Sequence, residues 1–315
     1  MNEFELIRRY FEPLQGRHAD DGVVLGIGDD AALLAPRAGH ELAVTTDTLI
    51  AGRHFPLQTS PYDIGWKALA VNLSDLAAMA AEPRWFTLAL SLPDADPAWL
   101  EGFARGLHAL SAQSGIVLAG GDTTRGPLTI TITAMGEVPR GSAVRRDGAR
   151  AGDLVCVTGT LGDAAAALRE VLAGQPANEF LLQRLNRPMP RVASGCALRR
   201  LANAMIDLSD GLAGDLQHIL RASGVGAVID ASALPSSAAL MSAASDAAAR
   251  QALQLSGGDD YELCLCLPAE RLVDACRAVE TPLTVIGRIT AEPGFRLHAA
   301  DGATMAPSSA GYQHF

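Results

Sequence analysis

The chain has 315 residues, of which 49% are hydrophobic and only 5% aromatic, so it is long enough for two globular domains with cores of small aliphatic side chains. Its formal net charge of -10 argues against a nucleic-acid surface, because phosphate backbones are bound by an excess of Lys and Arg. Lys67 is the only lysine and lies in Gly65-Trp66-Lys67-Ala68, which excludes a Walker A loop and the lysine strand of protein kinases.

The five cysteines include no Cys-x-x-Cys pair, which predicts reduced core residues rather than a disulfide framework or a zinc knuckle. Cys264 and Cys266 are two residues apart, the spacing that places both on one face of a buried strand. The first residues include acids and no apolar signal segment, and no apolar run reaches the roughly 18 residues of a membrane span. We therefore expect a cytoplasmic protein that does not enter a membrane.

Hydrophobic spacing and turn residues predict the elements of the first half of the chain. In order, they are a helix over 4–14, strands over 23–27 and 42–46, a helix from 60 to about 80, a strand over 85–92, a helix from 96 to about 114, and strands over 116–119 and 128–138. Ser60-Pro61 and Asp96-Pro97 supply the N-cap and first position of the two long helices. Residues 139–152 are polar and Gly-rich, so we place a domain boundary there.

The second half also alternates helices and strands. We expect a strand over 154–158, Ala-rich helices to about 201, a helix over 212–222, and strands over 227–229 and 261–267. The fold class is therefore α/β or α+β, with domains at 1–140 and 141–315.

The segment GIGDDA at 26–31 matches the Gly-x-Gly-x-x-Ala turn of dinucleotide-binding folds, and Asp47 follows Gly28 by 19 residues. That turn needs a helix whose N-terminus faces the diphosphate, but Pro36 comes too soon for one. Asp29 and Asp30 would also repel a diphosphate unless a cation lay between them. We therefore favour a Mg²⁺ site and keep a nicotinamide-dependent enzyme as an alternative.

Three further aspartates occupy comparable positions. Asp47 ends a predicted strand after two threonines, Asp75 lies within an apolar helix, and Asp122 follows a Gly-Gly turn. Each has a structural explanation by itself: a turn cap for Asp47, an ion pair with Lys67 or an arginine for Asp75, and an Asx turn for Asp122. Together they fit Mg²⁺, which draws oxygen ligands from carboxylates and from substrate phosphates.

The second half has two similar segments. Asp207 and Asp210 lie at the start of a predicted helix, where Ser209 or Asp210 would also serve as N-cap. The segment SGGDDYE at 256–262 precedes a strand, a pattern typical of a hairpin turn. Arg145-Arg146 is either a solvated pair or the source of one phosphate contact. His54 could line the cleft near the end of the strand 42–46, although a single histidine is more often structural.

Read in chain order, GIGDD, TTDTL, HF, NLSDLAAM, GGDTTRG, IDLSDGL and SGGDDYEL resemble the motifs of the thiamine-monophosphate kinase family, in the aminoimidazole ribonucleotide synthetase-like superfamily. The resemblance covers nearly the whole chain. It implies transfer of the γ-phosphoryl group of ATP to thiamine monophosphate. It also implies two α/β domains: an N-terminal ATP- and Mg²⁺-binding domain, whose mixed sheet pairs in the barrel of a homodimer, and a C-terminal α/β sandwich that completes the active site.

The resemblance also implies the site residues. Mg²⁺ would be held by Asp30, Thr45, Thr46, Asp47, Asp75, Asp122, Asp207 and Asp210, with Asp47, Asp122 and Asp207 as the catalytic aspartates. ATP would contact Gly121, Asp122, Arg146 and Ser209. Thiamine monophosphate would contact His54 and Asp259, and Tyr312 and Ser309 are candidates near the C-terminus. The family commonly has Glu where this chain has Asp259, and Trp where it has Ser309.

The chemistry agrees with this set of residues. The acceptor is itself an ionised phosphate, so no general base is needed, and the main obstacle is the repulsion between two anions. Several Mg²⁺ ions and an arginine would relieve it and allow in-line transfer. Two alternatives stay open: an ATP-dependent synthetase of aminoimidazole ribonucleotide, and a non-catalytic regulator that binds a metal or a nucleotide. His54 with Phe55 and the DLSDG segment favour the kinase.

Overall fold

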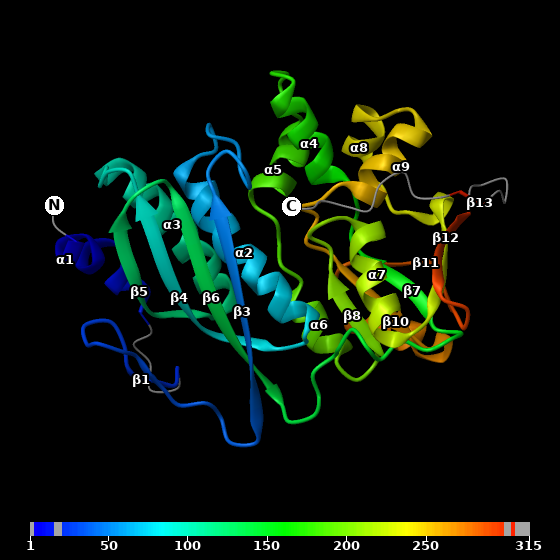
Figure 1. Cartoon of the computed structure of the whole chain (residues 1–315), viewed down its shortest axis with the longest axis horizontal. Coiled ribbons are helices and arrows are strands. Elements are labelled where there is room, and N and C mark those ends of the chain that lie inside the picture. The colour runs from blue at the N-terminus through cyan, green and yellow to red at the C-terminus, as the bar shows by residue number, and fades with distance from the viewer. Residues whose placement is uncertain (1–2, 16–20, 299–303, 306–315) are drawn as a thin grey trace. The chain divides into compact units, whose positions relative to one another are not determined.

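The structure is a computed structural model, and it describes residues 3–15, 21–298 and 304–305. The chain divides into two units, one of Met1–Leu76 with Ala81–Gly141 and the other of Ala77–Ala80 with Ser142–Phe315. Each unit has helices and a mixed sheet of its own, which confirms the predicted fold class (Figure 1). Among the described helices, none is both long and apolar enough to cross a membrane.

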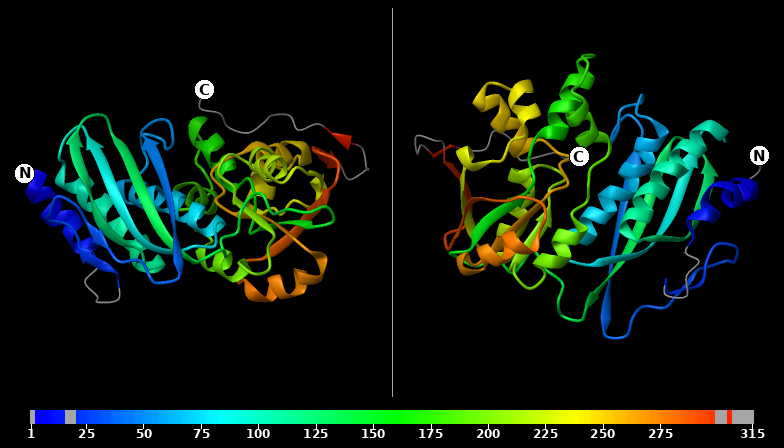
Figure 2. Two further views of the ribbon diagram at one scale, coloured as in Figure 1. Left: turned by 60° about the horizontal axis from the view of Figure 1, so that its bottom comes forward. Right: turned by 180° about the vertical axis from the view of Figure 1, so that it is seen from behind.

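Four strands form the main sheet of the first unit, in the order β3-β6-β4-β5. They are β3 (His40–Ile50), β4 (Glu82–Leu92), β5 (Val117–Arg125) and β6 (Thr129–Pro139). Strands β4 and β5 are parallel because the helix α3 (Pro97–Ser114) connects them, and the other pairs are antiparallel. Helices α3 and α2 (Pro61–Ala78) cover the same face of this sheet (Figure 2).

Both long helices begin where the sequence predicts. The Oγ of Ser60 accepts a hydrogen bond from the backbone N–H of Asp63 at 3.2 Å, and Oδ1 of Asp96 accepts one from Ala98 N at 3.0 Å. The predicted helix over 4–14 is less regular: α1 (Glu3–Leu6) continues into a π-helical turn (Ile7–Phe11) and a 3-10 turn (Glu12–Leu14). Two short strands, β1 (Val23–Leu25) and β2 (Leu33–Leu34), then pair antiparallel.

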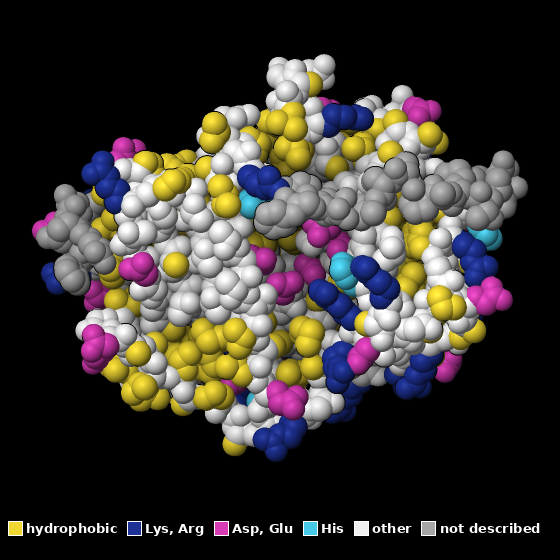
Figure 3. Space-filling view, viewed as in Figure 1, with side chains coloured by type: hydrophobic (Ala, Val, Ile, Leu, Met, Phe, Trp, Pro, Cys, Tyr) yellow, Lys and Arg dark blue, Asp and Glu magenta, His cyan; other side chains and the backbone are white. Residues whose placement is uncertain are grey.

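The sheet of the first unit has one covered and one open face. Phe86 and Ala134, which lie opposite each other, are both 0% exposed beneath the helices. On the other face, Leu42, Val44 and Ile50 of β3 are 43%, 58% and 41% exposed. Figure 3 shows hydrophobic side chains gathered over part of β3 and β6 on this open face.

Seven described strands form the sheet of the second unit, in the order β13-β12-β9-β11-β7-β10-β8. Their bounds are β7 (Leu154–Thr158), β8 (Ala204–Asp207), β9 (Gly226–Asp230), β10 (Leu263–Leu267), β11 (Leu283–Thr290), β12 (Gly294–His298) and β13 (Thr304–Met305). The helices are α4 (Asp163–Leu172), α5 (Glu179–Asn186), α6 (Val192–Leu198), α7 (Leu212–Ser223), α8 (Ala238–Ala243), α9 (Ala247–Ser256) and α10 (Leu272–Ala278).

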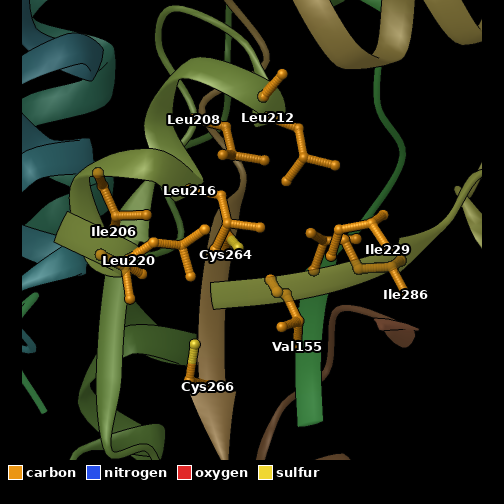
Figure 4. Packing of buried hydrophobic residues seen from close by; sticks show 14 of the residues in the cluster. Val155, Ile206, Leu208, Leu212, Leu216, Leu220, Ile229, Cys264, Cys266 and Ile286 are labelled. Atoms are coloured by element: carbon orange, nitrogen blue, oxygen red, sulfur yellow. The ribbon is translucent and has the colours of Figure 1, made fainter. Parts of the chain in front are cut away.

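The core of the second unit confirms the predicted placement of Cys264 and Cys266. Both point to the same face of β10, where the apolar side of α7 packs (Figure 4). All five cysteines remain thiols, and burial raises the pKa of the Cys264 thiol well above its usual value, which keeps it protonated. The core prediction is wrong for Cys276, which is exposed: on the short helix α10 its neighbour Ala275 takes the inward position.

Candidate active site

Three of the predicted metal ligands lie on the covered face of the first sheet. The hydroxyl of Thr45 on β3 donates a hydrogen bond to Oδ2 of Asp75 on α2 at 2.5 Å. Asp47 lies two residues beyond Thr45 on β3, so its side chain points to the same face. Both aspartates are half-buried. The prediction that Asp47 ends a strand is wrong, because β3 pairs with β6 as far as Ile50.

Thr46 and Asp122 point to the opposite, open face. The hydroxyl of Thr46 lies 2.9 Å from that of Thr133 on β6. Asp122 of β5 is paired with Ala89 of β4, and Ala89 is paired with Thr131 of β6, so all three side chains are on one face. That face is the open one, because the Thr131 hydroxyl is 2.9 Å from the hydroxyl of Thr48. The side chains of Asp122 and Asp47 are therefore on different sides of the sheet.

The GGD segment at 120–122 is part of a strand, and its predicted turn is wrong. It lies within β5, paired with β4 residue by residue. A Cβ on Gly121 would come within 1.9 Å of the Leu88 carbonyl oxygen, so only glycine allows β4 to approach this closely. Pairing with β4 thus overrides the turn preference of two adjacent glycines.

Asp30 lies in the turn between β1 and β2. Its backbone N–H donates to Oδ1 of Asp29 at 2.8 Å. No helix follows this turn, because Leu33–Leu34 form β2. The geometry required by a dinucleotide-binding fold is therefore missing at this turn, which argues against the nicotinamide alternative.

His54 lies in the turn after β3. Its ring Nδ1 accepts a hydrogen bond from the backbone N–H of Ile50 at 2.9 Å, and its own backbone N–H donates to the Ile50 carbonyl at 3.0 Å. An accepting Nδ1 assigns the proton of the neutral ring to Nε2. The backbone around Ile50 therefore fixes the orientation of this imidazole.

In the second unit, Asp207 is the last residue of β8 and only 4% exposed. The loop that follows differs from the prediction, because neither Ser209 nor Asp210 caps α7. The N-cap is Gly211, without a side-chain cap. Instead, Oδ2 of Asp215, inside the first turns of α7, accepts hydrogen bonds from the backbone N–H groups of Ser209 and Asp210, both at 3.0 Å.

Asp215 holds the loop of the candidate residues Ser209 and Asp210 but is absent from the residues predicted from the sequence, where the available signal is an acid within the first turns of a predicted helix. Burial raises its pKa to about 7, although the N–H donors of Asp210 and Ser209 and the positive charge of Arg146 act in the opposite direction. Burial also lowers the pKa of His218, and the charges of Arg221 and Arg146 add to this effect. The backbone carbonyl of Arg146 accepts a hydrogen bond at 2.9 Å from the hydroxyl of Ser223, the last residue of α7.

The segment 256–262 is not a hairpin, since it connects α9 to β10. It pairs instead with the loop after β8: Leu208 N donates to the Glu262 carbonyl at 2.8 Å, Tyr261 N to the Leu208 carbonyl at 2.8 Å, and Asp259 N to the Ser209 carbonyl at 2.9 Å. A Cβ on Gly258 would come within 2.5 Å of the Ser209 oxygen. The residues that bond to each other lie 50 to 54 positions apart in the chain. The loop after β8 and the segment 256–262 thus form one hydrogen-bonded pair of loops.

A buried cluster of charges lies at the end of this segment. Glu262 is 0% exposed, and its carboxylate accepts hydrogen bonds from Arg184 at 2.8 Å and from Arg191 at 2.5 and 2.7 Å. The Thr158 hydroxyl donates to it at 2.7 Å. The neighbouring Asp260 is 2% exposed and accepts from the backbone N–H of Gly162 at 2.8 and 3.0 Å. The loop that carries Asp259 is therefore anchored by buried ion pairs.

Two predicted substrate residues, Ser309 and Tyr312, lie outside the described residues. Within the described part of the chain, no three or more His, Cys, Asp or Glu side chains are grouped as a ready metal centre. The candidate ligands are instead distributed over several strands and loops.

Comparison with known proteins gives the family. The family model "AIR synthase related protein, N-terminal domain" matches residues 28–138, and the corresponding C-terminal domain model matches residues 150–300. The thiamine-monophosphate kinase of Salmonella typhimurium is 47% identical to this chain, over 99% of the chain and 98% of its own length. The chain belongs to the thiamine-monophosphate kinase family.

Solved structures of this family have the same fold. A thiamine-monophosphate kinase from Stenotrophomonas maltophilia K279a has a TM-score of 0.87 and 50% identity, and the match covers 97% of this chain and 98% of that one. A structure described as "AaThiL complexed with AMPPCP and TMP" has a TM-score of 0.80 and 32% identity, with 99% and 97% covered. The resemblance found in the sequence is confirmed, and the chain is a phosphotransferase enzyme.

Proposed function

We propose that this enzyme transfers the γ-phosphoryl group of ATP to thiamine monophosphate, forming thiamine diphosphate and ADP. The observation that carries the proposal is the relative complexed with AMPPCP and TMP, whose match covers 99% of this chain. AMPPCP is an analogue of ATP, so that relative holds a donor mimic together with the acceptor. The family relatives favour this reaction over the synthesis of aminoimidazole ribonucleotide.

We further propose Mg²⁺ ligation by Asp30, Thr45, Thr46, Asp47, Asp75, Asp122, Asp207 and Asp210. All eight offer oxygen donors, which hard cations prefer, and this donor chemistry fits Mg²⁺. Because Asp47 and Asp122 point to opposite faces of one sheet, their side chains would serve different ions. When bound, Mg²⁺ would offset the negative charge of the two phosphates that must meet.

We propose that the nucleotide contacts four residues: Gly121, Asp122, Arg146 and Ser209. Arg146 is exposed, so its guanidinium is free of surrounding protein on one side and could bind a phosphate in the transition state. Since the acceptor phosphate is already ionised, the residues need only position the two substrates for in-line attack. In this scheme Asp47, Asp122 and Asp207 act as ligands and not as bases.

Thiamine monophosphate is proposed to contact His54 and Asp259, with Ser309 and Tyr312 as further candidates. A carboxylate repels the phosphate of the substrate and attracts the cationic thiazolium ring of thiamine. Asp259 would therefore contact the thiamine end. The Nε2–H of a neutral His54 could donate a hydrogen bond to the substrate.

The direct test is to incubate the purified protein with ATP, Mg²⁺ and thiamine monophosphate and to separate the products by chromatography. We expect thiamine diphosphate and ADP in equal amounts, and none when EDTA removes the metal. ATP binding without any thiamine diphosphate would contradict the proposal and support the regulator. Activity that persists in EDTA would contradict the proposed metal sites but not the proposed reaction.

We also propose a cytoplasmic homodimer in which the open faces of two N-terminal sheets pair in a barrel. The exposed Leu42, Val44 and Ile50 on β3 support this, because apolar side chains gathered on a sheet face are typical of an interface.

A charged residue on this face should separate the dimer. We expect Val44→Glu to lower the mass measured by light scattering from twice the chain mass of 32.8 kDa to that of one chain, because two carboxylates would be buried in the barrel. The matched control is Val273→Glu on α10, since Val273 is also 58% exposed, and it should leave the mass unchanged. A Val44→Glu protein that stays a dimer would refute this interface.

A further inference from the structure

We propose that Tyr261 is a positioning residue that directs the carboxylate of Asp259 toward the cationic part of the substrate. The inference rests on the proposed function, in which Asp259 contacts the thiamine end. Tyr261 itself need not touch the substrate, because its hydroxyl acts through Asp259.

The backbone of this loop is held in an unusual conformation. Asp259 and Tyr261 have φ angles of +69° and +49°, in the left-handed region that residues with a side chain rarely adopt. Backbone strain of this kind persists only where the surroundings impose it, and it is frequent at ligand-binding sites. Here the N–H groups of both residues donate to the carbonyls of Ser209 and Leu208, at 2.9 and 2.8 Å. These bonds fix the direction in which the Cβ of Asp259 points.

The side chain of Asp259 is oriented by a second contact. The hydroxyl of Tyr261 donates a hydrogen bond to Oδ1 of Asp259 at 3.2 Å. Tyr261 is only 8% exposed, so its ring is enclosed by protein and its hydroxyl is a donor at a fixed place. Asp259 is half-buried. A fixed donor beside a short, partly exposed carboxylate selects one of its rotamers before the substrate arrives.

The residues on either side of Tyr261, Asp260 and Glu262, are also held by other segments of the chain. The next residue, Glu262, is bound by Arg184 and Arg191, and Arg184 also donates to the carbonyl of Asp260 at 3.2 Å. Asp260 in turn binds the backbone of Gly162. Each residue from 259 to 262 therefore has a hydrogen-bonding partner in another segment of the chain, and these bonds restrain the loop with the phenol beside Asp259.

The test is Tyr261→Phe, which keeps the ring and removes only the hydroxyl. We expect the KM for thiamine monophosphate to rise about tenfold, the change given by loss of one hydrogen bond to a charged group. The kcat and the KM for ATP should stay within about twofold. The matched control is Tyr10→Phe, because Tyr10 is 7% exposed and its hydroxyl donates to the Pro97 carbonyl at 3.4 Å in the first unit. Its kinetic constants should equal those of the wild type.

A double variant shows whether Tyr261 acts through Asp259. Asp259→Asn should raise the same KM, and adding Tyr261→Phe to it should cause no further rise. Two outcomes would overturn the proposal. The first is an active Tyr261→Phe enzyme whose KM for thiamine monophosphate is unchanged, even if its unfolding temperature is lower. The second is a double variant in which the KM increases of the two single substitutions multiply. Failure of the proposed function would look different, since the wild-type protein itself would then form no thiamine diphosphate.

Discussion

Asp47→Asn should lower kcat about a hundredfold or more while leaving the protein folded. The substitution removes the charge of a proposed metal ligand, and metal ions contribute several kcal/mol of transition-state stabilisation in phosphoryl transfer. The fold should survive, because β3 is held by backbone pairing with β6 along its whole length and Asp47 is half-buried near a second carboxylate, Asp75. Turnover is measured from thiamine diphosphate formation, and folding from the unfolding temperature.

Asp94→Asn is the matched control for this prediction. Asp94 is an exposed aspartate of the same unit, in the connection between β4 and α3, and it has no proposed role. Its replacement should leave turnover within about twofold, as is usual for surface substitutions. Near-normal turnover of Asp47→Asn would refute the assignment of Asp47 as a metal ligand. An equal loss of turnover in both variants would indicate an effect of the protein's net charge and not of one ligand.

Glu262→Gln should destabilise the protein by about 3–5 kcal/mol, the range found when one partner of a buried ion pair is removed. The side chains of Arg184 and Arg191 are 12% and 20% exposed, and both depend on the Glu262 carboxylate, which is 0% exposed. A neutral amide would remove the carboxylate that accepts hydrogen bonds from Nε and Nη2 of Arg191, and it would leave Arg184 with the more distant carboxylate of Asp163 at 3.7 Å. Urea unfolding measures the loss in the free energy of unfolding.

Glu292→Gln is the matched control, because it breaks an ion pair on the protein surface. Glu292 pairs with Arg296 at 3.3 Å, but its side chain is 85% exposed. Exposed ion pairs contribute roughly 0–1 kcal/mol, so this variant should unfold almost as the wild type does. If Glu262→Gln lost no more stability than Glu292→Gln, the cluster would not anchor the loop that carries Asp259.

The sequence by itself determined the features that depend on residues close together in the chain. Ser60 and Asp96 mark the starts of α2 and α3, because an N-cap bonds to backbone groups two or three residues away. The strand predicted over 154–158 is β7, whose run of apolar residues is buried throughout. Pro36 excluded a helix after the GIGDD turn. The order of the motifs also identified the family, which the comparisons confirm.

Only the tertiary structure decided where the candidate residues point and what holds them. Gly-Gly-Asp at 120–122 favours a turn locally, but pairing with β4 makes it a strand, and the register then places Asp122 on the face opposite Asp47. The predicted side-chain caps of α7 are absent, and the carboxylate of Asp215 reaches back to bind the backbone of the preceding loop. The bonds that join the loops of Ser209 and Asp259 link residues about 50 positions apart. Such contacts depend on strand pairing between distant segments, and local residue preferences contain no information about them.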